Sequence, residues 1–170
     1  MGAPFRILLT KQTTFVRRLL RRPSIDSAIA DINNMLAGRA LREVTATHIE
    51  HVLDTHHLRP LRTEHRQRLE RFYRDYLLFC LTDRRLSDDE VADLDHLRSI
   101  LGLSTSTVDV IHRTVARQVY LRSVAEVLAD GTIDEREREF LHKLRDHLAI
   151  PEAIAENIEE MKERQRKSRR

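Results

Sequence analysis

Residues 128–141, LADGTIDEREREFL, are echoed 47 residues earlier by residues 81–94, LTDRRLSDDEVADL. Each stretch holds an acidic turn, then a short polar residue with a glutamate three positions later, then apolar residues at helical spacing. The same offset aligns residues on both sides, including Tyr73 with Tyr120, Leu97 with Leu144, and Leu101 with Leu148. A fixed offset that preserves core positions and helix caps together predicts two copies of one helix–turn–helix unit.

The remaining sequence also favours helices, and no stretch alternates in the manner of a strand. The 170 residues include only four Gly and four Pro, and apolar residues recur at spacings of three and four. We therefore expect an all-α helical bundle of about seven helices with an internal pseudo-repeat. The expected helices cover 24–38, a segment capped by Thr47 and Glu50 that ends at Pro60, 63–81, 87–101, 105–129, 135–147 and 152–164.

Charge divides the chain into a body and two basic ends. No acid precedes Asp26, and the chain finishes with KERQRKSRR. The sequence predicts a basic amphipathic arm over 1–22, a helical extension over 24–62 packed on the bundle, a main helical domain over 63–161 and a basic disordered tail over 162–170.

The N-terminal arm combines an apolar stripe with flanking arginines, a pattern that suits an anionic membrane surface or a groove on a partner protein. Two alternatives are a helix docked on the bundle with a solvated basic edge, and a targeting segment. The candidate membrane-binding or partner-binding residues are Phe5, Leu8, Leu9, Arg17, Arg18, Leu19, Arg21 and Arg22.

The stretch ADGTIDEREREFLHKLRDHLAI at 129–150, with its weaker echo at 82–104, resembles the TerB-like family. This family comprises the tellurite-resistance helical domain, which also occurs in some membrane-bound DnaJ-type co-chaperones. The resemblance covers about 63–160 and implies a non-catalytic, stress-associated helical module with a weakly bound divalent cation. By motif position it implies metal-site residues Asp130, Asp134 and Glu137, and, more weakly, Asp83, Asp88 and Glu90. Arg84 replaces the family's turn glycine, which weakens the case for an ion in the first copy.

The acidic turns also have a purely structural interpretation. In an EF-hand alignment with Gly131 sixth, Leu128 falls on a ligand position, so half of the oxygen shell is missing. Ser87 with Glu90, and Asp134 with Glu137, fit capping boxes that need no ion. We favour caps over a metal site.

Other chemistry finds little support in the sequence. His48 and His51 stand three apart but supply too few ligands for a closed zinc site. Cys80 lies among apolar residues, which predicts a packed thiol in a reducing compartment, and there is no Gly-rich phosphate loop or nucleophile elbow. No apolar run is long enough to span a membrane.

These observations predict a protein that is not an enzyme. We expect a cytoplasmic interaction or scaffold module that binds a protein partner, with peripheral contact to an anionic membrane through the arm. One alternative is a stress protein that binds a divalent metal, and another is nucleic-acid binding through the basic termini.

Overall fold

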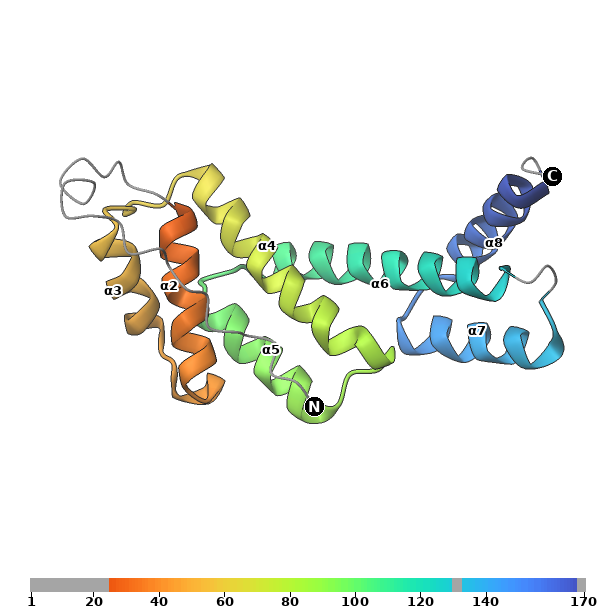
Figure 1. Cartoon of the computed structure of the whole chain (residues 1–170), viewed down its shortest axis with the longest axis horizontal. Helices are drawn as coiled ribbons and strands as arrows, with labels where there is room; N and C mark the ends of the chain where they lie inside the picture. Colours follow the sequence, from red (N-terminus) through yellow and green to blue (C-terminus); the bar gives the residue numbers. More distant parts are fainter. Residues whose placement is uncertain (1–24, 130–132, 168–170) are drawn as a thin grey trace. The chain divides into compact units, whose positions relative to one another are not determined.

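The computed structural model describes residues 25–129 and 133–167, with side chains described up to residue 164. These residues form seven α-helices and two short 3-10 helices, and they include no strand (Figure 1). The predicted all-α class and the expected number of helices are confirmed.

Two compact units divide the chain, and each is described by itself. Among the described residues, unit 1 comprises 25–79 and 87–108, and unit 2 comprises 80–86, 109–129 and 133–167. The domain boundaries predicted at residues 22, 62 and 161 were based on composition and not on contacts, and they stay a prediction.

Unit 1 is built from helices that each bury one apolar face. Helix α2 contacts α3, α3 contacts α5, and α5 contacts the 3-10 helix η1. Ile32, Ile49 and Leu97 are almost fully buried, because apolar residues three or four apart lie on the same helix face. The bounds are α2 Ile25–Gly38, η1 Leu41–Glu43, α3 Ala46–Thr55, α4 Thr63–Cys80 and α5 Asp88–Ile100.

Two local predictions in unit 1 differ from the structure. The cap of α3 is Thr45 with His48, not Thr47 with Glu50. The helix begins two residues earlier because the Thr45 side chain already accepts the first-turn N–H of His48. The helical spacing of Val91 and Leu94 within 87–101 predicts that both face inward, but Val91 is 51% exposed, since it lies at the polar start of α5, one turn before buried Leu94.

Unit 2 has a core formed by three helices. The C-terminal part of α6 supplies Tyr120 and Val124, α7 supplies Leu141 and Leu144, and α8 supplies Ile158, all in one apolar cluster. Phe140 and Leu148 pack against that cluster while partly exposed. The bounds are η2 Leu81–Asp83, α6 Thr105–Val127, α7 Glu135–His147 and α8 Glu152–Lys167 (Figure 1).

The internal repeat is visible in backbone geometry. Helices α5 and α7 are both 13 residues long, and both begin with a capping box. Two positions after each helix ends, a residue has positive φ, Gly102 at 64° after α5 and Ala149 at 49° after α7. The next amide then bonds back into the helix, from Leu103 to the Arg98 carbonyl at 3.1 Å and from Ile150 to the Arg145 carbonyl at 3.0 Å. Such bonds satisfy carbonyls at a helix C-terminus and turn the chain away.

Helix α8 continues beyond its expected end near Arg164 and runs to Lys167, into the segment predicted as a disordered tail. An ion pair between Arg164 and Glu160, four residues apart, supports this polar stretch of helix. Residues 168–170 lie outside the described ranges.

Candidate functional site

The acidic turn of the second copy is a helix cap. The Asp134 amide donates to Glu137 Oε2 at 2.8 Å, and the Glu137 amide donates to Asp134 Oδ1 at 2.8 Å. The two carboxylates thus satisfy backbone donors at the start of α7, where the helix dipole also favours negative charge. The predicted capping box is confirmed.

The first copy repeats this cap with a different turn before it. Ser87 donates its amide to Glu90 Oε2 at 2.8 Å, and the Glu90 amide donates to Ser87 Oγ at 3.3 Å. Asp83 Oδ1 accepts the Arg85 amide at 3.1 Å, whereas Asp88 lies in the first turn of α5. These contacts account for Asp83 and Glu90 without an ion.

Arg84 has a structural role where the repeat would place a glycine. Its backbone is left-handed, with φ of 65°, and its guanidinium donates to the Glu126 carboxylate. The same group lies 5.1 Å from the centre of the Phe140 ring, at cation–π distance. This arginine therefore ties the turn at 80–86 to α6 and α7 within unit 2.

The structure describes only some of the residues of the predicted metal site. Asp130 lies outside the described ranges, so the set of Asp130, Asp134 and Glu137 cannot be assembled. Among the described residues no three His, Cys, Asp or Glu side chains form a group that could hold a metal ion. The assignment of these residues stays a prediction.

The candidate residues of the N-terminal arm all fall outside the described part of the chain. These are Phe5, Leu8, Leu9, Arg17, Arg18, Leu19, Arg21 and Arg22. Their proposed contact with a membrane or partner therefore stays a prediction as well.

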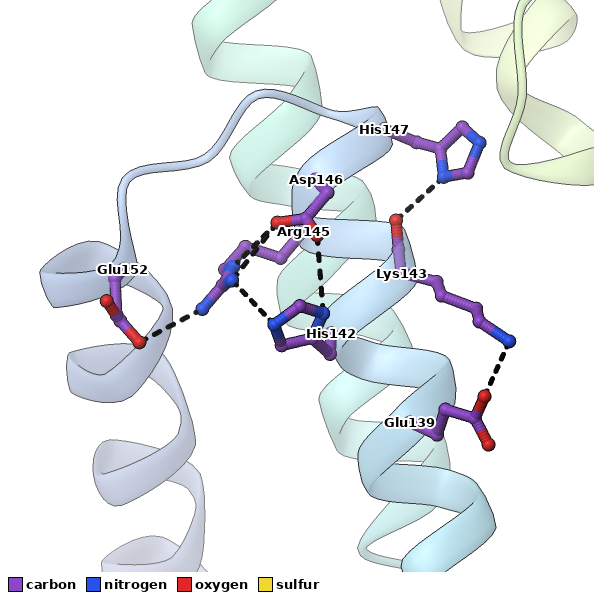
Figure 2. A network of polar contacts seen from close by, with 7 residues as sticks. All are labelled: Glu139, His142, Lys143, Arg145, Asp146, His147 and Glu152. Atoms are coloured by element: carbon purple, nitrogen blue, oxygen red, sulfur yellow. Dashed lines mark hydrogen bonds and ion pairs between the residues drawn. The ribbon is translucent and has the colours of Figure 1, made fainter.

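A polar network that the sequence analysis missed joins α7 to α8 in unit 2 (Figure 2). Arg145 is its centre: the guanidinium donates to Asp146 Oδ1 at 3.1 Å and to Glu152 Oε1 at 3.3 Å. Lys143 and Glu139 form a separate ion pair one turn away, at 2.7 Å. The spacing of basic and acidic residues was a visible signal, but it gave no indication that Arg145 bridges two helices.

The network also fixes the proton of one histidine. Arg145 Nη2 lies 3.0 Å from His142 Nε2, and a guanidinium only donates, so Nε2 must accept. The ring proton is therefore on Nδ1, 3.2 Å from Asp146 Oδ2. His142 therefore lies between an arginine and an aspartate on α7.

A partly buried contact links α6 to α8. Tyr120 is 1% exposed, and its hydroxyl donates to Glu159 Oε1 at 2.5 Å. Burial, together with this hydrogen bond, raises the pKa of Tyr120 well above its ordinary value. The contact positions the helices of unit 2 and offers no cleft for a substrate.

The exposed side of α6 differs from these paired surfaces. We call Val110, Arg113, Arg117 and Gln118 the α6 arginine face, because their spacing places them along one side of the helix. Val110 is 56% exposed, and within the described ranges neither arginine forms an ion pair or side-chain hydrogen bond. The spacing could have been found in the sequence, but the exposure could not.

The described part of the chain is thus an all-α protein whose polar clusters cap and join helices, with one basic and apolar helix side left unpaired. This chain belongs to the Tic110 family, described as a chloroplast envelope transporter, whose match covers residues 36–168. The family description names transport.

Individual relatives lead to the same family. The chain is 30% identical over 98 residues to Protein TIC110, chloroplastic, of Arabidopsis thaliana, and 27% identical over 98 residues to the Pisum sativum protein of that name. Each alignment covers 51% of this chain and 10% of the relative, so the chain spans about a tenth of the length of these proteins. No solved structure matches the chain.

These findings overturn the expected family, the expected functions and the expected location. The assignment to the TerB-like family is wrong, because residues 36–168 match Tic110. The predicted stress-related, metal-binding and nucleic-acid-binding functions are also wrong, because the family is described as a transporter. The prediction of a cytoplasmic protein is also wrong, because the family belongs to the chloroplast envelope and the relatives are chloroplast proteins. Among the described helices, none is long and apolar enough to cross a membrane.

Proposed function

We propose that this chain is a non-catalytic, protein-binding part of a transporter at the chloroplast envelope, and that the transport it serves is protein import. The observation that carries the proposal is the family match over residues 36–168. The all-helical fold supports it, because helices present extended side-chain rows that suit contact with another polypeptide.

The α6 arginine face is the surface we assign to this contact. Exposed arginines beside an apolar residue resemble the composition of protein interfaces, in which arginine is enriched. Asp109 lies one turn before Arg113, yet no ion pair joins the two among the described residues, so the guanidinium groups are free to bind outside partners. The partner segment should therefore be acidic.

The proposal is tested by reversing the charge of this face in the full chain. In organelles isolated from the organism that makes the protein, Arg113→Glu with Arg117→Glu should slow import of a labelled precursor, because like charges repel the acidic partner. The expected loss is about tenfold, the effect of removing two charged contacts at an interface.

Arg136→Glu is the matched control. Arg136 is an exposed arginine of α7 in the same unit, and it forms no ion pair in the described ranges. Import should continue at the normal rate in this variant. Equal import by the double variant and the native chain, or absence of the chain from the envelope fraction, would refute the proposal.

A further inference from the structure

Within the described ranges, capping boxes begin α3, α5 and α7, and the box on α3 differs from the other two in one residue. The boxes of α5 and α7 use a glutamate at the third helical position, whereas the box of α3 uses His48. A glutamate remains an acceptor throughout the neutral pH range, but an imidazole accepts only while one ring nitrogen is unprotonated.

The contacts define which nitrogen that is. The Thr45 amide donates to His48 Nδ1 at 3.1 Å, and the His48 amide donates to Thr45 Oγ1 at 3.4 Å. Because a backbone N–H only donates, Nδ1 must carry a lone pair, so the ring proton is on Nε2. The cap is complete only when His48 is neutral.

Protonation of His48 acts against the helix in two ways. A proton on Nδ1 leaves the Thr45 amide without its acceptor, because a protonated ring nitrogen can only donate. The added positive charge also lies in the first turn, where the helix dipole disfavours cations. Both effects destabilise the first turn of α3.

The charged groups on the elements that contact α3 are paired elsewhere or stand apart from the cap. On α2, Asp31 pairs with buried His56 and Asp26 pairs with Arg68. On α5 and η1, Asp89 and Asp93 both pair with Arg42.

Further along α5, Asp95 pairs with Arg98, His96 bonds the Val44 carbonyl at 2.8 Å, and Glu90 belongs to the Ser87 cap. On α3 itself, Glu50 and Asp54 both pair with Arg59. The remaining titratable groups on these elements are Glu43, His51 and Asp88, and no ion pair joins any of them to His48 in the described structure.

We propose that His48 makes the start of α3 a pH-sensitive cap, which is closed when the imidazole is neutral and opens when the ring takes a proton from solvent. Opening loosens the first turn of α3 next to Ile49, which is 2% exposed. Because α3 contacts both α2 and α5, acidification weakens the packing of unit 1 from this end.

Amide hydrogen exchange on the full chain tests the proposal, with protection compared at about pH 7.5 and about pH 5.5, on either side of the usual histidine transition. Protection of the Thr45, His48 and Ile49 amides should fall about fivefold at the lower pH, the effect expected when a helix cap is lost. The amides of Glu90 and Glu137 are internal references, because their capping partners are the Ser87 hydroxyl and the Asp134 carboxylate and not an imidazole.

Three variants distinguish His48 from the other histidines near it. His48→Gln keeps an acceptor that does not titrate, so the α3 response should vanish while protection is retained. His51→Gln, the same change on an exposed position of the same helix, should leave the response intact. His56→Gln should also leave it, since His56 pairs with Asp31 at the other end of α3.

The proposal is overturned by either of two results. One is a fall in protection at α3 no larger than that at Glu90 and Glu137. The other is a response that persists in His48→Gln. A nitrogen NMR spectrum that placed the neutral ring proton of His48 on Nδ1 would contradict the assigned geometry directly.

Discussion

Tyr120 is the residue in which packing and hydrogen bonding combine most closely in unit 2. Its ring belongs to the apolar cluster, and its hydroxyl reaches Glu159 on α8 at 2.5 Å. A buried hydroxyl needs a partner, because an unsatisfied polar group costs free energy in an apolar surrounding. The hydroxyl therefore fixes α8 against α6 through one defined contact.

Replacement of Tyr120 by Phe should lower the free energy of unfolding by about 1 kcal/mol at neutral pH, the usual worth of one hydrogen bond. The free energy of unfolding of the variant should also fall less at alkaline pH than that of the native chain. The folded-state pKa of Tyr120 is raised, so its contribution is present below about pH 10 and is lost as pH rises above that value. Urea unfolding at neutral pH and at about pH 11 measures both effects.

Glu159→Gln is the control for this contact, since the amide oxygen still accepts the hydroxyl while the charge is removed. Its effect at neutral pH should be smaller than that of Tyr120→Phe. A Tyr120→Phe protein as stable as the native chain at both pH values would contradict the structure at this residue.

Ser123 shows the opposite situation. Its side chain is 1% exposed, and Oγ has no hydrogen-bond partner among the described residues. Ser123→Ala should leave stability unchanged or raise it by up to about 1 kcal/mol, because alanine removes an unsatisfied hydroxyl and favours helix. Thermal unfolding measures the change, with Val124→Ala as the contrasting variant, since that substitution deletes packed methyl groups and should destabilise. A marked loss on Ser123→Ala would show that the hydroxyl has a partner.

At this scale the sequence predicted apolar positions better than polar contacts. The helical spacing of Ile49, Val52 and Leu53 predicts that these residues are buried on α3, and all three are. The cap of the same helix was misplaced, because Thr45 with His48 and Thr47 with Glu50 are equally spaced and only the backbone shows which pair closes. The Arg145 bridge depends on two helices meeting, which no local pattern reports.

At the scale of elements, the ends of α5 and α7 offer a matched pair. A left-handed residue follows the end of each helix, but the first copy has Gly102 where the second has Ala149. The left-handed conformation is strained for alanine and not for glycine. No atom lies within 4 Å of a Cβ built at Gly102, so conformational strain is the only expected obstacle there.

Substitutions at these two positions should have opposite signs. Ala149→Gly should raise the free energy of unfolding by about 0.5 to 1 kcal/mol, and Gly102→Ala should lower it by a similar amount. Denaturant unfolding of the two variants beside the native chain measures both. Two changes of the same sign would mean that the helix ends do not share this geometry.

The start of α7 tests whether Asp134 acts as a cap. Asp134→Ala should cost about 1 kcal/mol, whereas Asp134→Asn should cost much less, because asparagine caps a helix about as well as aspartate. Thermal unfolding in the presence of a chelator measures these values without any contribution from a cation. Equal losses in the two variants would indicate that the charge of Asp134, and not its acceptor oxygen, is what stabilises the turn.

Helix positions were predictable because their signals are local and redundant. Capping residues, helical spacing and the glycine after α5 agree with one another, and the observed helices fall close to the predicted ones. The end of α8 was placed too early, since its last turns lack an apolar face and depend on ion pairs such as Arg164 with Glu160. The apolar spacing that predicts a helix stops before residue 164, but the helix itself continues.

At the scale of the whole molecule, the fold class was predicted correctly and the family was not. The motif that suggested a TerB-like protein consists largely of capping residues, which any helix after an acidic turn can use. It therefore indicated an architecture and could not indicate ancestry. The Tic110 match begins at residue 36 and includes α3, in the region that the earlier resemblance left unexplained.

The central claim is that the chain binds protein at the chloroplast envelope through the α6 arginine face. A photoreactive amino acid in place of exposed Val110 tests it most directly, with illumination of intact organelles during import. We predict adducts with protein in the envelope fraction, reduced about tenfold by Arg113→Glu with Arg117→Glu and unchanged by Arg136→Glu. Adducts with lipid or nucleic acid alone, or protein adducts that survive charge reversal, would contradict the account.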